Sequence, residues 1–171
     1  MKASRSLRPL TLACLLLLVG CTGYESVRVA PEEQPTVAMV PVRNEAYLPG
    51  FAPTVQERVR HELLRSRTVR LVNEPAEADR ILALVLADYQ EAPLSFESDD
   101  TGIASSAETE LTVRVRLENP GTQSSRETVV RVREPVFADS GSFVGPLDQS
   151  QTILAGKIAR EVRTWVEQAL R

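Results

Sequence analysis

Few residues of this chain have the types and spacing that acid–base or metal chemistry requires. His61 is the only histidine, and the pattern around it puts it on the polar side of a helix, so a Ser-His-Asp triad or a metal cluster lacks its other members. Glu108 and Glu110 point the same way along an alternating strand, as glycosidase carboxylates do, but no aromatic platform accompanies them. We therefore expect no catalytic residue and no metal site, and we expect that the protein is not an enzyme. The alternative is a hydrolase, which would have to lose its activity when Glu108 or Glu110 is mutated.

Cys21 offers chemistry of another kind. Leu18-Val19-Gly20 precede it, and the four residues together resemble the lipobox of bacterial lipoprotein precursors. Such a site needs small residues before the cut, so that the chain lies extended in the peptidase groove. It needs a thiol at the first mature position, because sulfur is the nucleophile that takes the diacylglyceryl group. We expect cleavage before Cys21 and a stable anchor of several acyl chains on it, palmitate among them, with no other cofactor.

Residues 1–20 have the organisation of a secretory signal peptide. Three basic residues are followed by an apolar run from 10 to 19. That run is too short to span a bilayer core of about 30 Å, which needs about 20 apolar residues in a helix, and its flanks are those of a signal. The alternatives are an ordinary signal with a chance cysteine at its end, or an uncleaved anchor.

The mature chain is acidic and has no cysteine pair. Loss of the three basic residues of the signal leaves 17 basic against 23 acidic residues, a net charge of −6. Nucleic acid is an unsuitable partner, because its binding proteins usually show a basic footprint. Cys14 leaves with the signal, so a hydrophobic core must stabilise one domain, residues 36–171. Residues 21–35 are expected to form a lipidated, solvated tether before that domain.

Two segments have the period of amphipathic helices. From Phe51 to about Arg67 the apolar residues recur every fourth position, and Glu62 falls near the edge of that stripe without an evident reason. A second helix is expected from Asp148 to the C-terminus. Its stripe consists of Leu154, Ile158, Val162, Trp165, Val166 and Ala169.

Other segments have the patterns of β-strands. Residues 111–117 alternate strictly between apolar and polar side chains, the period of a half-buried strand. The same pattern returns at 130–133 after a turn at 119–121. Shorter β-branched runs at 36–42 and 69–72 are also interpreted as strands.

Residues 81–87 are apolar at every position. Periodicity does not separate a buried strand from a helix here, and leucine and alanine favour a helix. We interpret the segment as a strand, because the strands that follow need a central partner. The order of elements then predicts an α+β two-layer sandwich: two amphipathic helices on one face of a mostly antiparallel four-stranded sheet, with the other face polar.

From Cys21 to the terminal helix the chain resembles the lipopolysaccharide-assembly lipoprotein (LptE) family, through a series of short segments in order. These are Gly23-Tyr24, the strand and loop 37–44, Tyr47-Leu48-Pro49-Gly50, Glu77-Ala78-Asp79, Pro93-Leu94-Ser95-Phe96 and Glu108 to Val113. The chain departs from the family where Thr22 separates Cys21 from Gly23, and in 139–147, which matches no family motif.

The resemblance implies a role without catalysis. A member of the family would sit at the periplasmic face of the outer membrane, plug an LptD-like β-barrel translocon and help it insert lipopolysaccharide. The absence of Asp after Cys21, where Thr22 stands, also favours the outer membrane. The alternative is a periplasmic lipoprotein scaffold of another envelope complex, for secretion, efflux or glycan anchoring.

Four arginines are the candidate contacts for lipopolysaccharide. Arg114, Arg116, Arg131 and Arg133 should project from one face of adjacent strands, and guanidinium groups pair bidentately with phosphate. The alternative is a solvated face on which neighbouring glutamates balance these charges through cross-strand pairs.

Three residues are the candidate contacts for the barrel. Tyr47 and Leu48 precede the Pro49-Gly50 corner, and Phe143 stands between glycines in a loop. The alternative for the corner is that Phe51 belongs to the core and Tyr47 packs over the sheet edge.

Overall fold

The computed structural model describes residues 34–96, 104–137 and 146–171. In chain order its elements are β1 (Thr36–Met39), β2 (Arg43–Asn44), α2 (Phe51–Leu64), β3 (Arg70–Val72), a 3-10 turn (Pro75–Glu77), β4 (Arg80–Phe96), β5 (Ala104–Asn119), β6 (Ser124–Phe137) and α3 (Pro146–Ala169). Within these ranges no helix is long and apolar enough to cross a membrane.

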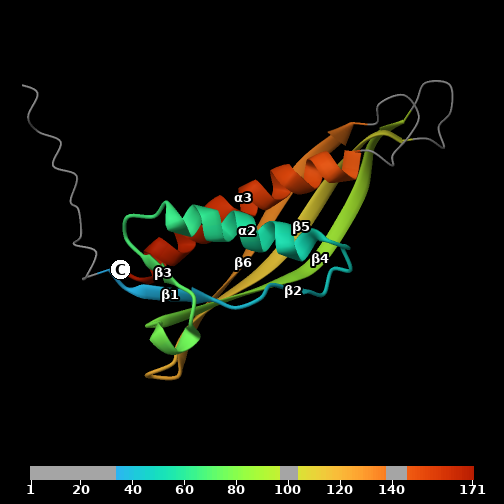
Figure 1. The fold of residues 1–171 in the computed structure, drawn as a ribbon. Helices are drawn as coiled ribbons and strands as arrows, with labels where there is room; N and C mark the ends of the chain where they lie inside the picture. Colours follow the sequence, from blue (N-terminus) through green and yellow to red (C-terminus); the bar gives the residue numbers. More distant parts are fainter. Residues whose placement is uncertain (1–33, 97–103, 138–145) are drawn as a thin grey trace, which may run out of the picture.

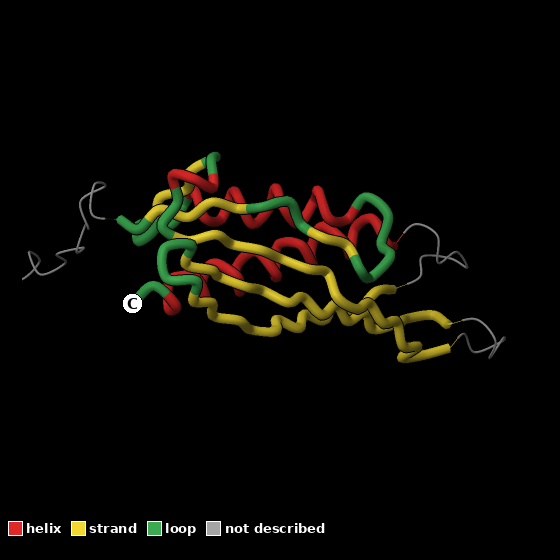
Figure 2. The backbone as a smooth tube through the Cα atoms, turned by 90° about the horizontal axis from the view of Figure 1, so that it is seen from below, coloured by secondary structure: helices red, strands yellow, loops and turns green. Residues whose placement is uncertain are grey.

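The elements form two layers, with both helices on one face of the sheet (Figures 1 and 2). The strand order is β3-β1-β4-β5-β6, and β2 pairs with β4 beyond the end of β1. The two-layer α+β prediction is confirmed, but the predicted sheet was wrong in two respects. It has six strands rather than four, and β1 runs parallel to β3 and β4, as β2 does to β4.

The parallel part of the sheet follows from the helix between β1 and β3. A strand that returns through a helical crossover re-enters the sheet in the same direction, whereas β4, β5 and β6 are joined directly and pair antiparallel. The strand expected at 36–42 ends at Met39, and β2 begins only at Arg43, beyond the expected run. Pro41 lies in the gap, because proline cannot donate a ladder hydrogen bond.

The segment 81–87 is a strand, as predicted. Leu82, Leu84 and Leu86 are buried under the helices, while Ala83 and Val85 are half-buried on the opposite face. The apolar content of both faces is explained by the central place of β4, which has β1 and β2 on one side and β5 on the other.

The core lies between the sheet and one stripe of each helix. The predicted inner face of β5 is buried, as are Phe51, Val55, Val59 and Leu63 on α2. On α3 the buried residues include Leu154, Ile158, Val162 and Val166, while Trp165 is only half-buried. Each buried valine or leucine contributes about 1.5–3 kcal/mol.

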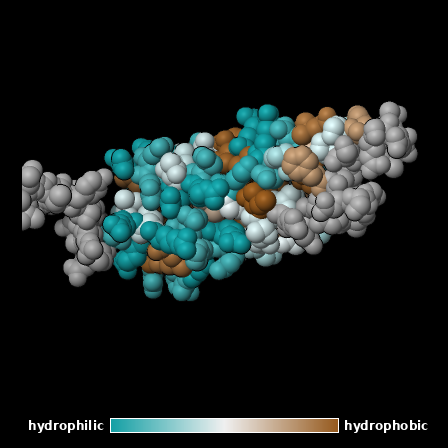
Figure 3. All heavy atoms as spheres, turned by 90° about the horizontal axis from the view of Figure 1, so that it is seen from above, coloured by the Kyte–Doolittle hydropathy of each residue, from teal (hydrophilic) through white to brown (hydrophobic). Residues whose placement is uncertain are grey.

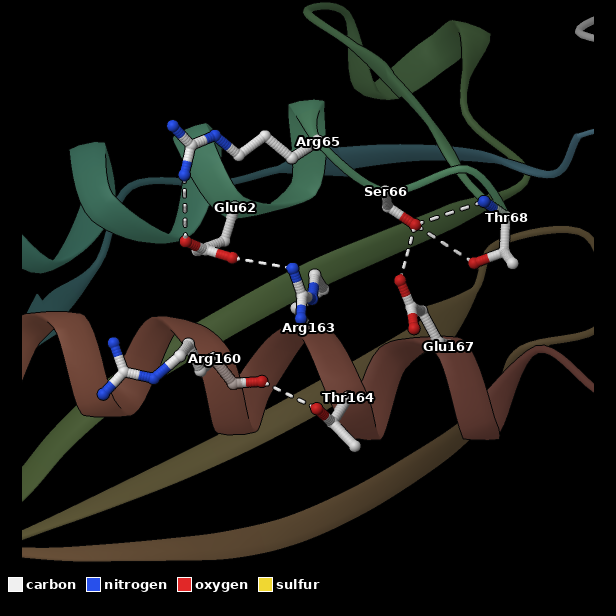
Figure 4. Close-up of polar contacts among 8 residues, drawn as sticks. All are labelled: Glu62, Arg65, Ser66, Thr68, Arg160, Arg163, Thr164 and Glu167. Atoms are coloured by element: carbon white, nitrogen blue, oxygen red, sulfur yellow. Dashed lines mark hydrogen bonds and ion pairs between the residues drawn. The ribbon is translucent and has the colours of Figure 1, made fainter.

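Polar contacts connect the two helices above this core (Figure 4). The carboxylate of Glu62 accepts a hydrogen bond from Arg163 at 2.9 Å, and Arg65 lies 3.8 Å from its other oxygen. One turn further, Ser66 donates to Glu167 at 2.7 Å. Glu62 therefore falls at the edge of the apolar stripe because it faces α3 and not solvent.

Candidate functional site

The outer face of the sheet carries the four arginines. In the β5–β6 register Arg114 lies opposite Val129 and Arg116 opposite Glu127, while Arg131 and Arg133 lie opposite Thr112 and Glu110. All four side chains belong to the face away from the helices, as strand alternation predicts.

Most of these charges have carboxylate partners. Arg114 binds Glu45 at 2.5 Å, and Arg43 binds the other oxygen of that carboxylate at 2.7 Å. Arg116 lies between Glu118 at 3.6 Å and Glu127 at 3.5 Å.

Arg133 and Arg131 differ in this respect. Arg133 binds Glu110 at 2.5 Å, with Glu108 at 3.9 Å, and the hydrogen bond that Arg133 donates to Glu110 raises the pKa of its guanidinium. The two glutamates considered as catalytic carboxylates are therefore both engaged with one arginine. Within the described ranges no carboxylate lies at ion-pair distance from Arg131.

An apolar hollow of about 410 Å³ opens on the same face. Val40 and Pro41 form one wall, where the chain leaves β1 and has not yet entered β2. Ala83, Val85 and Val129 add to the apolar lining, and Arg43, Arg114, Arg116 and Glu127 contribute to the polar rim. A chain of methylene groups fits such a lining, with anionic groups at the guanidinium rim. Sequence reasoning missed this hollow, although Pro41 and the small Ala83 are its local signals.

The loop before α2 presents one aromatic side chain to solvent. The Asn44 side chain donates to the Leu48 carbonyl at 2.6 Å and accepts from the Leu48 N–H at 3.4 Å. Tyr47, at the centre of this loop, has φ of 56° and is 91% exposed. Phe51 is core, as expected, but the prediction that Tyr47 packs over the sheet edge was wrong. Leu48 is half-buried against the core, and Phe143 lies outside the described residues.

Large apolar side chains are exposed at the far ends of β4 and β6. Leu94 is 56% exposed, Phe96 51% and Phe137 69%. These strand ends lie at the opposite end of the molecule from residue 34, where the described chain begins (Figures 1 and 2). Figure 3 shows apolar surface at that end on the helical side. Sequence reasoning noted Pro93-Leu94-Ser95-Phe96 only as a motif and did not identify it as an exposed apolar end.

The sequence of residues 34–169 matches the family model for lipopolysaccharide assembly, LptE. The chain belongs to the LptE family. The match includes every described strand and both helices, so the family resemblance inferred from short motifs is confirmed. No curated protein matches the sequence.

Solved structures show the same fold for this LptE-family chain at low sequence identity. Protein XCC0632 from Xanthomonas campestris is similar with a TM-score of 0.57 and 14% identity, over 80% of this chain and 85% of that one. Uncharacterized lipoprotein B from Nitrosomonas europaea is similar with a TM-score of 0.50 and 14% identity, over 76% and 81%.

The Glu77-Ala78-Asp79 motif of this LptE-family chain has a structural role. One Asp79 carboxylate oxygen accepts hydrogen bonds from the Thr36 N–H and hydroxyl, each at 2.8 Å, and the Asp79 N–H donates back to that hydroxyl at 2.8 Å. The bond from the Thr36 N–H, followed by that from its hydroxyl, lowers the pKa of Asp79. The motif thus fixes the start of β1 beside the start of β4.

Proposed function

We propose that the mature protein, lipidated on Cys21, is the plug and assembly partner of the outer-membrane β-barrel translocon that inserts lipopolysaccharide into the outer leaflet. Residues 1–20 are the signal peptide, 21–35 the tether and 36–171 the working domain on the periplasmic face. The role is assembly without catalysis. The observation that carries this proposal is the family match over residues 34–169.

The distribution of polarity supports a plug. The interior of a wide membrane barrel is polar, and the outer sheet face carries several arginine–glutamate pairs. The exposed Leu94, Phe96 and Phe137 lie at the end of the domain opposite residue 34, where the described chain begins. A tether of 15 residues, 21–35, reaches at most about 50 Å, so the anchor leaves the domain free to enter a barrel from the periplasmic side. We propose that the apolar end, with Tyr47, contacts the barrel, as Leu48 and Phe143 are also predicted to do.

The partner test uses the tagged full-length chain expressed in its own host. Proteins that co-purify from a detergent extract of the envelope are identified by mass spectrometry, and labelled palmitate is followed in parallel. We expect an outer-membrane β-barrel in the eluate and label on the wild type but not on Cys21→Ser. A soluble periplasmic partner in place of a barrel, or an unlabelled wild type, contradicts the proposal.

A second part of this proposal, independent of the barrel partnership, is that four arginines bind lipopolysaccharide phosphates directly. These are Arg114, Arg116, Arg131 and Arg133. Phosphate must displace glutamate at three of the four guanidinium groups, and Arg131 is the one without a described competitor. We expect Arg114→Glu with Arg131→Glu to weaken lipopolysaccharide binding about tenfold, since a charge-assisted hydrogen bond contributes about 1.5–3 kcal/mol.

A matched control has the same change of net charge on the helical side. Arg58→Glu with Arg160→Glu alters two exposed residues of α2 and α3, and its lipopolysaccharide affinity should equal that of the wild type. Equal affinities for both double variants would remove the arginine face from the proposal and leave the barrel partnership to the co-purification test.

A further inference from the structure

Among the described strands β6 ends the sheet. Within the described residues its outer edge is protected at both ends and open in the middle. Toward its C-terminal end, the Lys157 ammonium of α3 donates to the Arg133 carbonyl at 2.6 Å and pairs with Glu134 at 2.7 Å. Toward its N-terminal end, Arg126 donates to the Ala169 carbonyl at the end of α3, at 2.8 Å. Between these contacts lies a hollow of about 320 Å³.

One wall of this hollow is the strand edge itself, residues Thr128 to Arg131. The Thr109 hydroxyl of β5 donates to the Glu134 carbonyl, so that carbonyl points into the sheet, whereas the Arg133 carbonyl points outward to Lys157. Peptide groups alternate in direction along an antiparallel strand. The N–H and C=O groups of Val129 and Arg131 therefore face the hollow.

The other wall is one face of α3. Glu161, Thr164, Trp165 and Gln168 line it and follow the three- and four-residue spacing of a helix face. Trp165 and Val130, both half-buried, give the helical side of the hollow an apolar part. On the sheet's outer side stand Val129, 47% exposed, and Arg131.

We propose that this open edge binds a short extended segment of a partner protein as an additional strand. An unpaired strand edge beside a helix supplies main-chain hydrogen bonds on one side and side-chain contacts on the other, the arrangement of β-augmentation. Side chains of an added strand alternate between the two faces. The segment therefore alternates apolar residues, packed toward Trp165 and Val130, with acidic residues beside Arg131.

The protected ends exclude a second copy of β6 as the occupant. Two β6 strands paired around Val130 would need the Arg133 carbonyl of each copy, which Lys157 occupies, and lysine at an edge is a common guard against such pairing. The open stretch of four residues is about 13 Å long, which suits a short peptide. This inference goes beyond the proposed function, because it requires neither the barrel nor lipopolysaccharide.

The test uses the acylated protein in detergent and two fluorescein-labelled probes, the peptide Val-Glu-Val-Glu-Val and its Val-Lys-Val-Lys-Val counterpart. We expect the glutamate peptide to bind at least tenfold more tightly by fluorescence anisotropy. It should also slow amide hydrogen exchange at Val129 and Arg131, and leave the amides of α2 unchanged.

Two variants separate edge pairing from other binding modes. Val129→Pro removes one edge N–H and should abolish binding, whereas Ser125→Pro makes the same change at an edge position outside the hollow and should bind as the wild type. Arg131→Glu should reverse the peptide preference, which keeps the proposal testable if Val129→Pro fails to fold.

Three results would overturn the proposal. The first is equal exchange at Val129 and Arg131 with and without peptide, and the second is wild-type affinity in a folded Val129→Pro variant. The third is a dimer by analytical ultracentrifugation that Val129→Pro dissociates, which would assign the edge to a second copy of the chain.

Discussion

The single polar side chain of Asp79 holds the start of β1 in place. Its carboxylate receives the Thr36 N–H, which would otherwise be an unpaired donor at the start of β1. Removal of an acceptor from a partly buried donor typically costs about 1–3 kcal/mol. The Asp79 side chain itself is exposed, so the lower end of that range applies.

We predict that Asp79→Ala lowers the free energy of unfolding by about 1 kcal/mol at pH 7. Folding depresses the pKa of Asp79, so its stabilisation is fully present above its unfolded pKa of about 4 and is lost as the pH falls through the lower folded value. Urea unfolding of both proteins between pH 2.5 and pH 7 measures the difference. If the difference in unfolding free energy between the wild type and Asp79→Ala stays constant below pH 4, the charge on Asp79 contributes nothing to stability.

At this scale some predictions followed from the sequence and others did not. Strand alternation placed the four arginines on one face, and their neighbouring glutamates were visible as cross-strand partners. The exposure of Tyr47 was not predictable, because it depends on a positive φ held by Asn44 side-chain bonds to Leu48. The role of Glu62 was not predictable either, because it depends on the contact with Arg163, which lies on a helix about a hundred residues away in the sequence.

Among the elements, local patterns predicted the helices and the antiparallel strands, whereas the parallel pairings of β1, β2 and β3 were not foreseen. Periodicity indicates which face of a segment is buried, as the strict alternation of apolar and polar residues does in β5. Periodicity does not indicate which strands pair with one another. The place of β1 between β3 and β4 follows only from the helical crossover.

The contact between α2 and α3 gives a prediction at this scale. In a double-mutant cycle of Glu62→Gln and Arg163→Gln, we expect a coupling energy of about 1 kcal/mol, because both side chains are largely shielded and the 2.9 Å bond joins two helices. The matched control is the exposed Arg116–Glu118 pair at 3.6 Å, for which a coupling near the lower limit of about 0.2 kcal/mol is expected. Equal couplings from urea unfolding would mean that the bridge adds nothing to the packing of the helices.

The whole molecule is an elongated sandwich, with residue 34 at one end and the far ends of β4 and β6 at the other (Figure 1). Leu94, Phe96 and Phe137 are exposed at those strand ends. The lipidation of Cys21 stays a prediction, while the family was accessible from the sequence, since its ordered motifs are local. The apolar end was not, because it depends on how far β4 and β6 extend beyond the helices that cover the rest of the sheet.

Photo-crosslinking in living cells tests the partnership most directly. A photoreactive phenylalanine analogue replaces Phe137 at the apolar end or, as the control, Thr122 in the turn at the opposite end of the β5–β6 hairpin. We predict a covalent adduct from position 137 to an outer-membrane β-barrel, and a weaker adduct from position 122. An adduct from position 137 to a soluble periplasmic protein alone would contradict it.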